Sequence, residues 1–320
     1  LHLLGLCLQQ LHHSHMYSLI ALIIIYKRLS KYTTDTIKSA FRQEYLFMPD
    51  SFNSLENALL SSSVNERIEM TRQAFELCHQ NSSFIEPVNR IIKPIDLVRF
   101  PDKPICVAPR DLPRRRLGTE AGKRSFIHAI AHIEFNAIKL ALDIAYRFKG
   151  MPAQFYKDWV YVANDECKHF QLLCNHLATY DCQYGDNPSH DGLWSMAVKT
   201  DDNLLARLSL VPRYLEARGL DVTPAMLEKL YAQKDMDTAA ILEIILEDEV
   251  THVEFGTKWL DFVCENEGVE REDVFFEHVE RLLKGQILGP FNKPLRLRAG
   301  FTPSELLELE RLDKRKLKQT

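Results

Sequence analysis

The chain has 320 residues, of which 46% are hydrophobic, so it is long enough to bury a sizeable core in one large domain. Its formal net charge of -4 argues against a broadly basic nucleic-acid-binding protein. Its seven cysteines are an odd number and contain no Cys-x-x-Cys pair. A disulfide framework is therefore not expected, and the cytoplasm or another reducing compartment is favoured.

The first 33 residues are expected to be a poorly ordered or artefactual extension. The chain begins with Leu1 rather than Met, and its apolar run from Tyr17 to Tyr26 is only ten residues long. Such a run is too short to span a bilayer, so no membrane association is expected. A targeting leader is the alternative, although no basic segment precedes the run.

Residues 34–113 are predicted to form a helical arm followed by a strap. Two helices are expected, over residues 34–60 and 64–80, separated by Ser61-Ser62-Ser63. Residues 87–113 contain six of the fourteen prolines, which excludes a long helix. We expect an extended strap there, with a lid over a functional site as the alternative.

Residues 114–320 are predicted to contain four core helices and further C-terminal helices. The first two should run from Thr119 to Phe148 and from Pro152 to about Thr179, followed by a long connection to Thr200. The third should start near Asp201, be distorted by Pro212, and break near Gly219, with Thr223-Pro224 opening a separate short helix. The fourth should end near Gly268, and later helices are expected over residues 270–284 and after a Thr302 capping box.

One motif occurs twice within these helices. Asp165-Glu166-Cys167-Lys168-His169 lies in the second helix and Asp248-Glu249-Val250-Thr251-His252 in the fourth. Residues three apart share a helix face, so each glutamate points the same way as its histidine. Apolar residues flank both pairs on that face. A buried carboxylate is costly unless it is paired or protonated, so a cation is predicted beside each pair.

Two more glutamates complete a candidate ligand set. Glu134 and Glu216 lie on the apolar faces of the first and third helices, 32 and 33 residues before Glu166 and Glu249. Two antiparallel hairpins would bring all four positions to one depth. One Glu from each of two helices plus Glu-x-x-His from each of two others is a di-iron or di-manganese ligand set. The predicted metal ligands are Glu134, Glu166, His169, Glu216, Glu249 and His252.

Four further residues are candidates for supporting roles. We expect Asp165 and Asp248 to accept a hydrogen bond from the non-ligating nitrogen of a ligand histidine on the other helix. An exposed aspartate on the helix flank is the alternative. His132 is a candidate for contact with the ligands or for the surface, and Tyr161 could line a substrate pocket, although core packing is the commoner use of such a ring.

These motifs carry a family resemblance. Five blocks between Pro109 and Leu309 are distinctive: His128 to Glu134, Asp165 to His169, Tyr184 to Trp194, Leu210 to Gly219, and Gly289 to Asn292. On them the chain resembles an uncharacterised family of ferritin-like proteins, domain of unknown function 455. The resemblance implies an all-α ferritin-like four-helix bundle with one long crossover, an N-terminal helical arm, extra C-terminal helices and a di-metal centre. It implies no settled substrate.

The expected function is a dioxygen-activating oxidoreductase with two iron ions, or two manganese ions, which suit the same ligands. Its substrate would be an unidentified small molecule or modified nucleotide, the latter by analogy with a tRNA hydroxylase built on a similar bundle, and its electron donor is unknown. The alternatives are a ferroxidase or iron-handling protein and a non-catalytic helical scaffold. The arm, the strap and the C-terminal helices argue against a storage cage, so a monomer or dimer is expected.

Overall fold

The computed structural model describes residues 51–80, 90–113, 115–283 and 287–313. The expected extension of residues 1–33 and residues 34–50 of the predicted arm lie outside this part of the chain. Within it the regular structure is helical, and the one β-type contact is an isolated bridge between Cys106 and Ser189. In chain order the helices are α4 (Ser51–Leu60), α5 (Val64–Gln80), α6 (Glu120–Arg147), α7 (Ala153–Ala178), α8 (Gly192–Val198), α9 (Leu204–Leu210), the π-helical turn η3 (Val211–Glu216), α10 (Ala217–Ala232), α11 (Met236–Glu267), α12 (Arg271–Leu283), α13 (Lys293–Arg298) and α14 (Pro303–Leu312).

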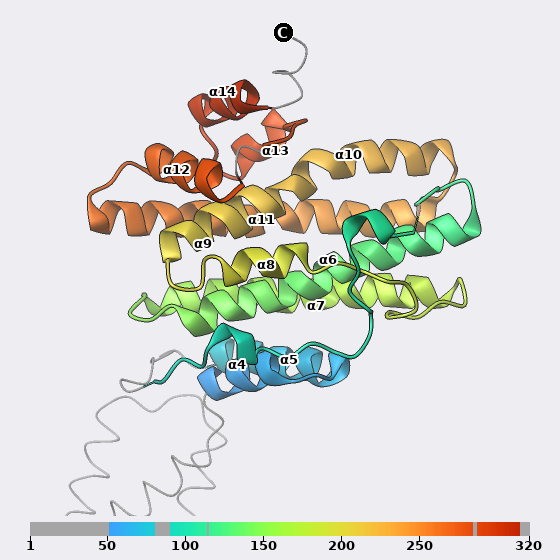
Figure 1. Ribbon diagram of the computed structural model, residues 1–320, viewed down its shortest axis with the longest axis horizontal. Helices are drawn as coiled ribbons and strands as arrows, with labels where there is room; N and C mark the ends of the chain where they lie inside the picture. Colours follow the sequence, from blue (N-terminus) through green and yellow to red (C-terminus); the bar gives the residue numbers. More distant parts are fainter. Residues whose placement is uncertain (1–50, 81–89, 114, 284–286, 314–320) are drawn as a thin grey trace, which may run out of the picture. The chain divides into compact units, whose positions relative to one another are not determined.

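Helices α6 and α7 form the predicted first hairpin and pack along their lengths (Figure 1). The Thr119 side chain caps α6 by accepting a hydrogen bond from the Gly122 amide, which supplies a partner for one of the free N–H groups of the first turn. Gly150 has a φ of +73°, a left-handed conformation that favours glycine, and Pro152 is the N-cap residue of α7. Local signals therefore predicted both helix ends correctly.

The second hairpin pairs the segment α9–η3–α10 with α11 (Figure 1). The distortion expected at Pro212 is present, because Pro212 lies in η3 and has no N–H with which to continue an α-helix. The break predicted near Gly219 and Thr223-Pro224 is wrong. Helix α10 runs through Pro224 without interruption. The buried face of α10, formed by Leu220, Leu227 and Leu230, packs on α11 and holds the helix across the missing hydrogen bond.

The two hairpins meet where α11 packs against α7, and α8 of the crossover lies between α6 and η3. On the other side of the first hairpin, α4 contacts α6 and α5 contacts α7. Residues 90–113 of the predicted strap are extended apart from two short 3-10 turns, Ile95–Leu97 and Pro109–Asp111, and residues 87–89 lie outside the described ranges. Asp235 caps the start of α11, Gly268 ends it with a φ of +69°, and Thr302 with Glu305 forms the predicted capping box of α14.

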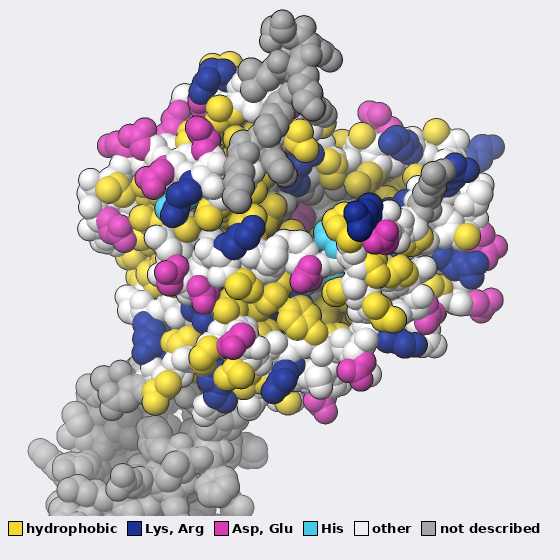
Figure 2. All heavy atoms as spheres, viewed as in Figure 1, with side chains coloured by type: hydrophobic (Ala, Val, Ile, Leu, Met, Phe, Trp, Pro, Cys, Tyr) yellow, Lys and Arg dark blue, Asp and Glu magenta, His cyan; other side chains and the backbone are white. Residues whose placement is uncertain are grey.

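Acidic and basic side chains are interspersed on the face drawn in Figure 2 rather than gathered by sign. None of the helices in the described ranges is both long and apolar enough to cross a lipid bilayer.

Gly256 sets the distance between α11 and η3. A Cβ atom built there would lie 2.6 Å from Pro212 Cβ and 2.9 Å from Pro212 Cγ. A helical Gly→Ala change normally stabilises a protein, but the proline ring is tied to the backbone, so η3 would have to move. We expect Gly256→Ala to lower the free energy of unfolding by about 1–3 kcal/mol, measured by urea denaturation.

Gly118→Ala is the matched control for this change, because no atom lies within 4 Å of the Cβ built there. It should leave the free energy of unfolding nearly unchanged. A Gly256→Ala protein as stable as the wild type would show that the close contact with Pro212 does not constrain η3.

Candidate metal centre

Six acidic and imidazole side chains that are distant in the sequence come from four helical segments. Glu134 lies on α6, Glu166 and His169 on α7, Glu249 and His252 on α11, and Glu216 at the end of η3. The first five are buried, and both carboxylate oxygens of Glu216 are buried although the rest of its side chain is partly exposed. The structure therefore gathers the candidate ligands away from solvent.

Five of the six form two groups of cation-binding size that share one carboxylate. Glu134, Glu166 and His169 offer ligand atoms within 4.8 Å of one another, and so do Glu166, Glu249 and His252. His169 Nδ1 is 3.3 Å from Glu134 Oε2 and 3.3 Å from Glu166 Oε2. His252 Nδ1 is 3.0 Å from Glu166 Oε1 and 3.8 Å from Glu249 Oε2. Glu166 thus turns one oxygen toward each histidine.

Glu216 lies beside these groups rather than within either of them. Its carboxylate is close enough for its pKa to respond to the charges of Glu166 and His252. Neither of its oxygens has a hydrogen-bond partner in the described part of the chain. A buried carboxylate without a partner is costly, so this position favours a cation nearby.

The polar atoms of this cluster fit a metal better than they fit one another. Glu134 Oε2, Glu166 Oε1, Glu249 Oε2 and His252 Nδ1 are all buried, and none makes a well-aligned hydrogen bond among the described residues. The short distances from His169 Nδ1 to Glu134 Oε2 and from His252 Nδ1 to Glu166 Oε1 are therefore contacts without hydrogen-bond geometry, whereas His169 Nδ1 does form a hydrogen bond with Glu166 Oε2 at 3.3 Å. Lone pairs that converge without bonding to each other are what a shared cation would satisfy.

The electrostatics of the cluster point the same way. Burial raises the pKa of Glu134 to about 8, and the charge of Glu166 adds to this effect. The pKa of Glu216 is raised to about 8 by the same two causes. Burial lowers the pKa of His169, but its contacts with Glu134 and Glu166 outweigh burial and raise that pKa to about 12. Without a metal these groups hold protons at neutral pH, and an entering cation must displace them.

Both histidines are held from outside by aspartates of the opposite helix. His169 Nε2 donates to Asp248 Oδ2 at 3.0 Å, and His252 Nε2 donates to Asp165 Oδ2 at 3.4 Å. These are the bonds expected from the sequence. Because a carboxylate only accepts, each bond places a hydrogen on Nε2 and leaves Nδ1, which faces the glutamates, as the nitrogen that could hold a metal ion.

Lys168 joins the two aspartates and was missed in the sequence. Its Nζ lies 2.7 Å from Asp248 Oδ2 and 3.8 Å from Asp165 Oδ1, with half of its side chain exposed. One lysine at the surface therefore contacts the outer partner of each histidine. The sequence pattern that could have identified Lys168 is its position three residues after Asp165, which places both on one helix face.

His132 and Tyr161 have other neighbours than the candidate ligands. His132 Nδ1 lies 2.9 Å from the Tyr184 hydroxyl, and its Nε2 lies 3.1 Å from the His190 carbonyl. His132 therefore holds the crossover against α6. Tyr161 is 37% exposed and packs edge-on against Phe255, so it lies at the surface.

We expect Asp248→Ala to weaken metal retention by about 10- to 100-fold, because His169 would lose the group that fixes its ring and its tautomer. Competition with a chelator, followed by metal analysis, measures the change. The neighbouring Glu247→Ala is the control, since Glu247 is exposed and pairs with Arg298. Equal retention in both variants would remove the positioning role from Asp248.

The helices and the buried cluster together define an all-helical protein with Glu and His groups that could hold a metal ion. The chain belongs to the family described as "Protein of unknown function (DUF455)", which it matches over residues 60–307. It is 40% identical over 265 residues to an uncharacterized protein of Haemophilus influenzae. The matched region covers 80% of this chain and 92% of that protein. No solved structure matches the chain.

Proposed function

We propose that this chain is a ferritin-like di-iron carboxylate oxidoreductase that activates dioxygen to oxidise or hydroxylate an unidentified organic substrate. The observation that carries the proposal is Glu166, which turns one oxygen toward each of two buried histidines while Glu134, Glu216 and Glu249 surround it. The two core hairpins and the crossover between them also agree with a ferritin-like four-helix bundle. Manganese suits the same oxygen and imidazole ligands.

In this assignment Glu134, Glu166 and His169 would hold one ion, and Glu166, Glu249 and His252 would hold the other. Glu216, whose pKa responds to Glu166 and His252, would complete the set. When bound there, a pair of ferrous ions would supply the electrons for the reduction of dioxygen. Asp165 and Asp248 orient the histidines and keep Nδ1 available. Glu134, Glu166, His169, Glu249 and His252 are themselves buried, which excludes bulk water from the cluster.

The test is to load the protein with ferrous iron without oxygen and then to measure dioxygen uptake with an electrode. We expect uptake to follow the amount of bound iron and zinc-loaded protein to consume none. Iron-loaded protein that takes up no dioxygen would overturn the proposal. A very large assembly with many irons per chain in size-exclusion chromatography would instead indicate an iron-storage protein.

A further inference from the structure

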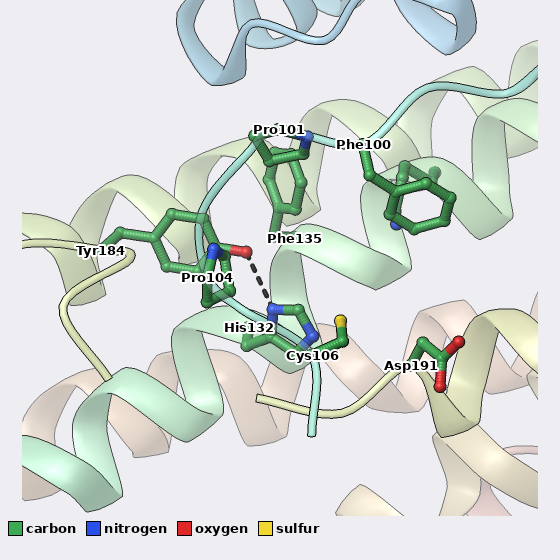
Figure 3. A pocket seen from close by; sticks show the side chains of 9 residues that line it. Phe100, Pro101, Pro104, Cys106, His132, Phe135, Tyr184 and Asp191 are labelled. Carbon is green, nitrogen blue, oxygen red and sulfur yellow. Dashed lines mark hydrogen bonds between the residues drawn. The ribbon is translucent and has the colours of Figure 1, made fainter. Parts of the chain in front are cut away.

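A separate pocket lies between the strap, the crossover and α6 (Figure 3). It has a volume of about 240 Å³, the size of a single ring rather than of a large cofactor. From α6 it is lined by His132, Phe135 and Lys139, whose spacing places them on one helix face. Glu134 lies on a different face, so this pocket is not part of the candidate metal centre.

Lys139 is the unusual residue of this pocket. Its side chain is fully buried, and its Nζ has no hydrogen-bond or ion-pair partner within the described ranges. Aromatic rings lie close to this atom. Nζ lies 3.6 Å from the centre of the Phe100 ring and 5.1 Å from the centre of the Trp194 ring. A buried lysine normally has a carboxylate beside it, but no carboxylate of the described residues forms an ion pair with this one.

The surroundings favour the uncharged amine. Burial lowers the pKa of Lys139 well below its usual value, and the positive charge of Arg67 lowers it further. The aromatic rings favour the ammonium form only modestly. Asp191 and Cys106 raise the pKa of Lys139, but their effect is smaller than that of burial. An uncharged lysine in an apolar pocket keeps its lone pair and is a nucleophile.

We propose that this pocket binds a small aldehyde or ketone with a flat apolar body and that Lys139 condenses with it. Nζ attacks the carbonyl carbon and forms the new C–N bond. The two hydrogens of the amine leave with the carbonyl oxygen as water, and the product is an imine, with no change of oxidation state. The aromatic walls suit a flat ring, and the Asp191 carboxylate at the same pocket disfavours an anion.

Phe100 controls access to the amine. It covers Nζ although its own side chain is 39% exposed. The strap is anchored before it, where Arg67 donates to the Arg99 carbonyl at 2.7 Å, and after it, where the Val107 amide donates to the Ser189 carbonyl at 2.8 Å. Between these anchors Phe100–Pro104 make no backbone hydrogen bond with any described residue. Rotation of one side chain on an unpaired stretch would expose Lys139.

The test uses benzaldehyde with borohydride, which reduces an imine to a stable benzylamine, on the full chain at pH 7. Peptide mass spectrometry then gives the rate at each lysine. We expect Lys139 to be modified at least about tenfold faster than Lys103, an exposed lysine of the same strap. A rate at Lys139 equal to or below that at Lys103 would overturn the proposal. The proposal would also be overturned if benzoate bound in this pocket while benzaldehyde gave no adduct at Lys139. That result would identify an anion site.

Phe100→Ala provides the second measurement. It should accelerate modification of Lys139 several-fold and leave Lys103 unchanged, and an unchanged rate at Lys139 would overturn the role given to Phe100. Metal loading should not alter either rate, because Lys139 and Glu134 lie on different faces of α6. The outcome is therefore independent of whether the candidate metal centre binds iron.

Discussion

Glu166→Gln is expected to abolish binding of both metal ions. Glu166 is the one carboxylate shared by the two groups, and its oxygens lie 3.3 Å and 3.0 Å from the Nδ1 atoms of His169 and His252. An amide keeps the shape of the side chain but removes the charge and one acceptor oxygen. Metal analysis after gel filtration should fall from two ions per chain to none.

Two comparisons make this result specific. His169→Gln should remove only the ion held with Glu134 and leave one per chain, because His169 belongs to one group. Glu254→Gln changes an exposed residue two positions after His252 and should retain both ions. Circular dichroism checks that each variant is folded. If folded Glu166→Gln protein retains two ions, the shared carboxylate is not a ligand.

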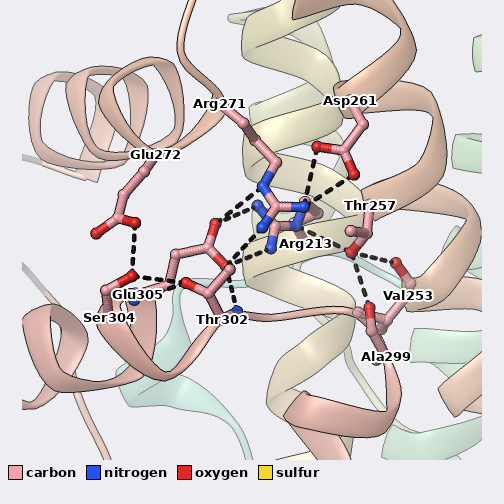
Figure 4. Close-up of polar contacts among 10 residues, drawn as sticks. All are labelled: Arg213, Val253, Thr257, Asp261, Arg271, Glu272, Ala299, Thr302, Ser304 and Glu305. Carbon is pink, nitrogen blue, oxygen red and sulfur yellow. Dashed lines mark hydrogen bonds and ion pairs between the residues drawn. The ribbon is translucent and has the colours of Figure 1, made fainter.

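Arg213→Ala is expected to cause the largest loss of stability. Arg213 of η3 is fully buried and donates to both carboxylate oxygens of Glu305 in α14, at 3.0 Å and 3.1 Å (Figure 4). Its Nε also donates to Thr257 of α11. Its removal would leave the Glu305 charge buried with weaker compensation, which costs about 3–5 kcal/mol. The melting temperature should fall by roughly 5–15 °C in a thermal unfolding scan.

The double variant Arg213→Met/Glu305→Leu tests the cause of this loss. If the cost comes from an unpaired buried charge, replacing both partners by apolar groups should recover much of the stability. Arg298→Ala is the matched control, because Arg298 and Glu247 form an exposed ion pair and their separation should change the melting temperature little. A double variant that is no more stable than Arg213→Ala would assign the loss to packing instead.

The features that the sequence predicted correctly depend on interactions within one or two helical turns. Thr119, Gly268 and Thr302 were identified as helix ends because a cap acts on the residues beside it. The two Glu-x-x-His pairs were identified because three residues make nearly one turn. The aspartate–histidine bonds followed once these two motifs were placed side by side.

The features that the sequence did not predict depend on packing between distant segments. Pro224 has a strong local tendency to end a helix, but contacts of α10 with α11 override it. Arg213 and Glu305 are 92 residues apart, and neither carries a local mark of burial. Lys139 looks like an ordinary helical lysine until Phe100 and Trp194 are brought over it. Such pairings arise only when the chain is folded.

The π-helical turn η3 also sets the direction in which the side chains of α10 point around the helix axis. A π turn holds one residue more than an α turn, so each later side chain points about 100° away from where an uninterrupted α-helix would direct it. Deleting Pro212 would remove both the extra residue and the residue that lacks an N–H, so that an ordinary α-helix forms while the chain's composition stays almost intact. Yet it would swing either Glu216 away from the histidines or Leu220, Leu227 and Leu230 away from α11. The extra residue thus allows the continuous helix η3–α10 to direct Glu216 toward the cluster and its apolar face toward α11.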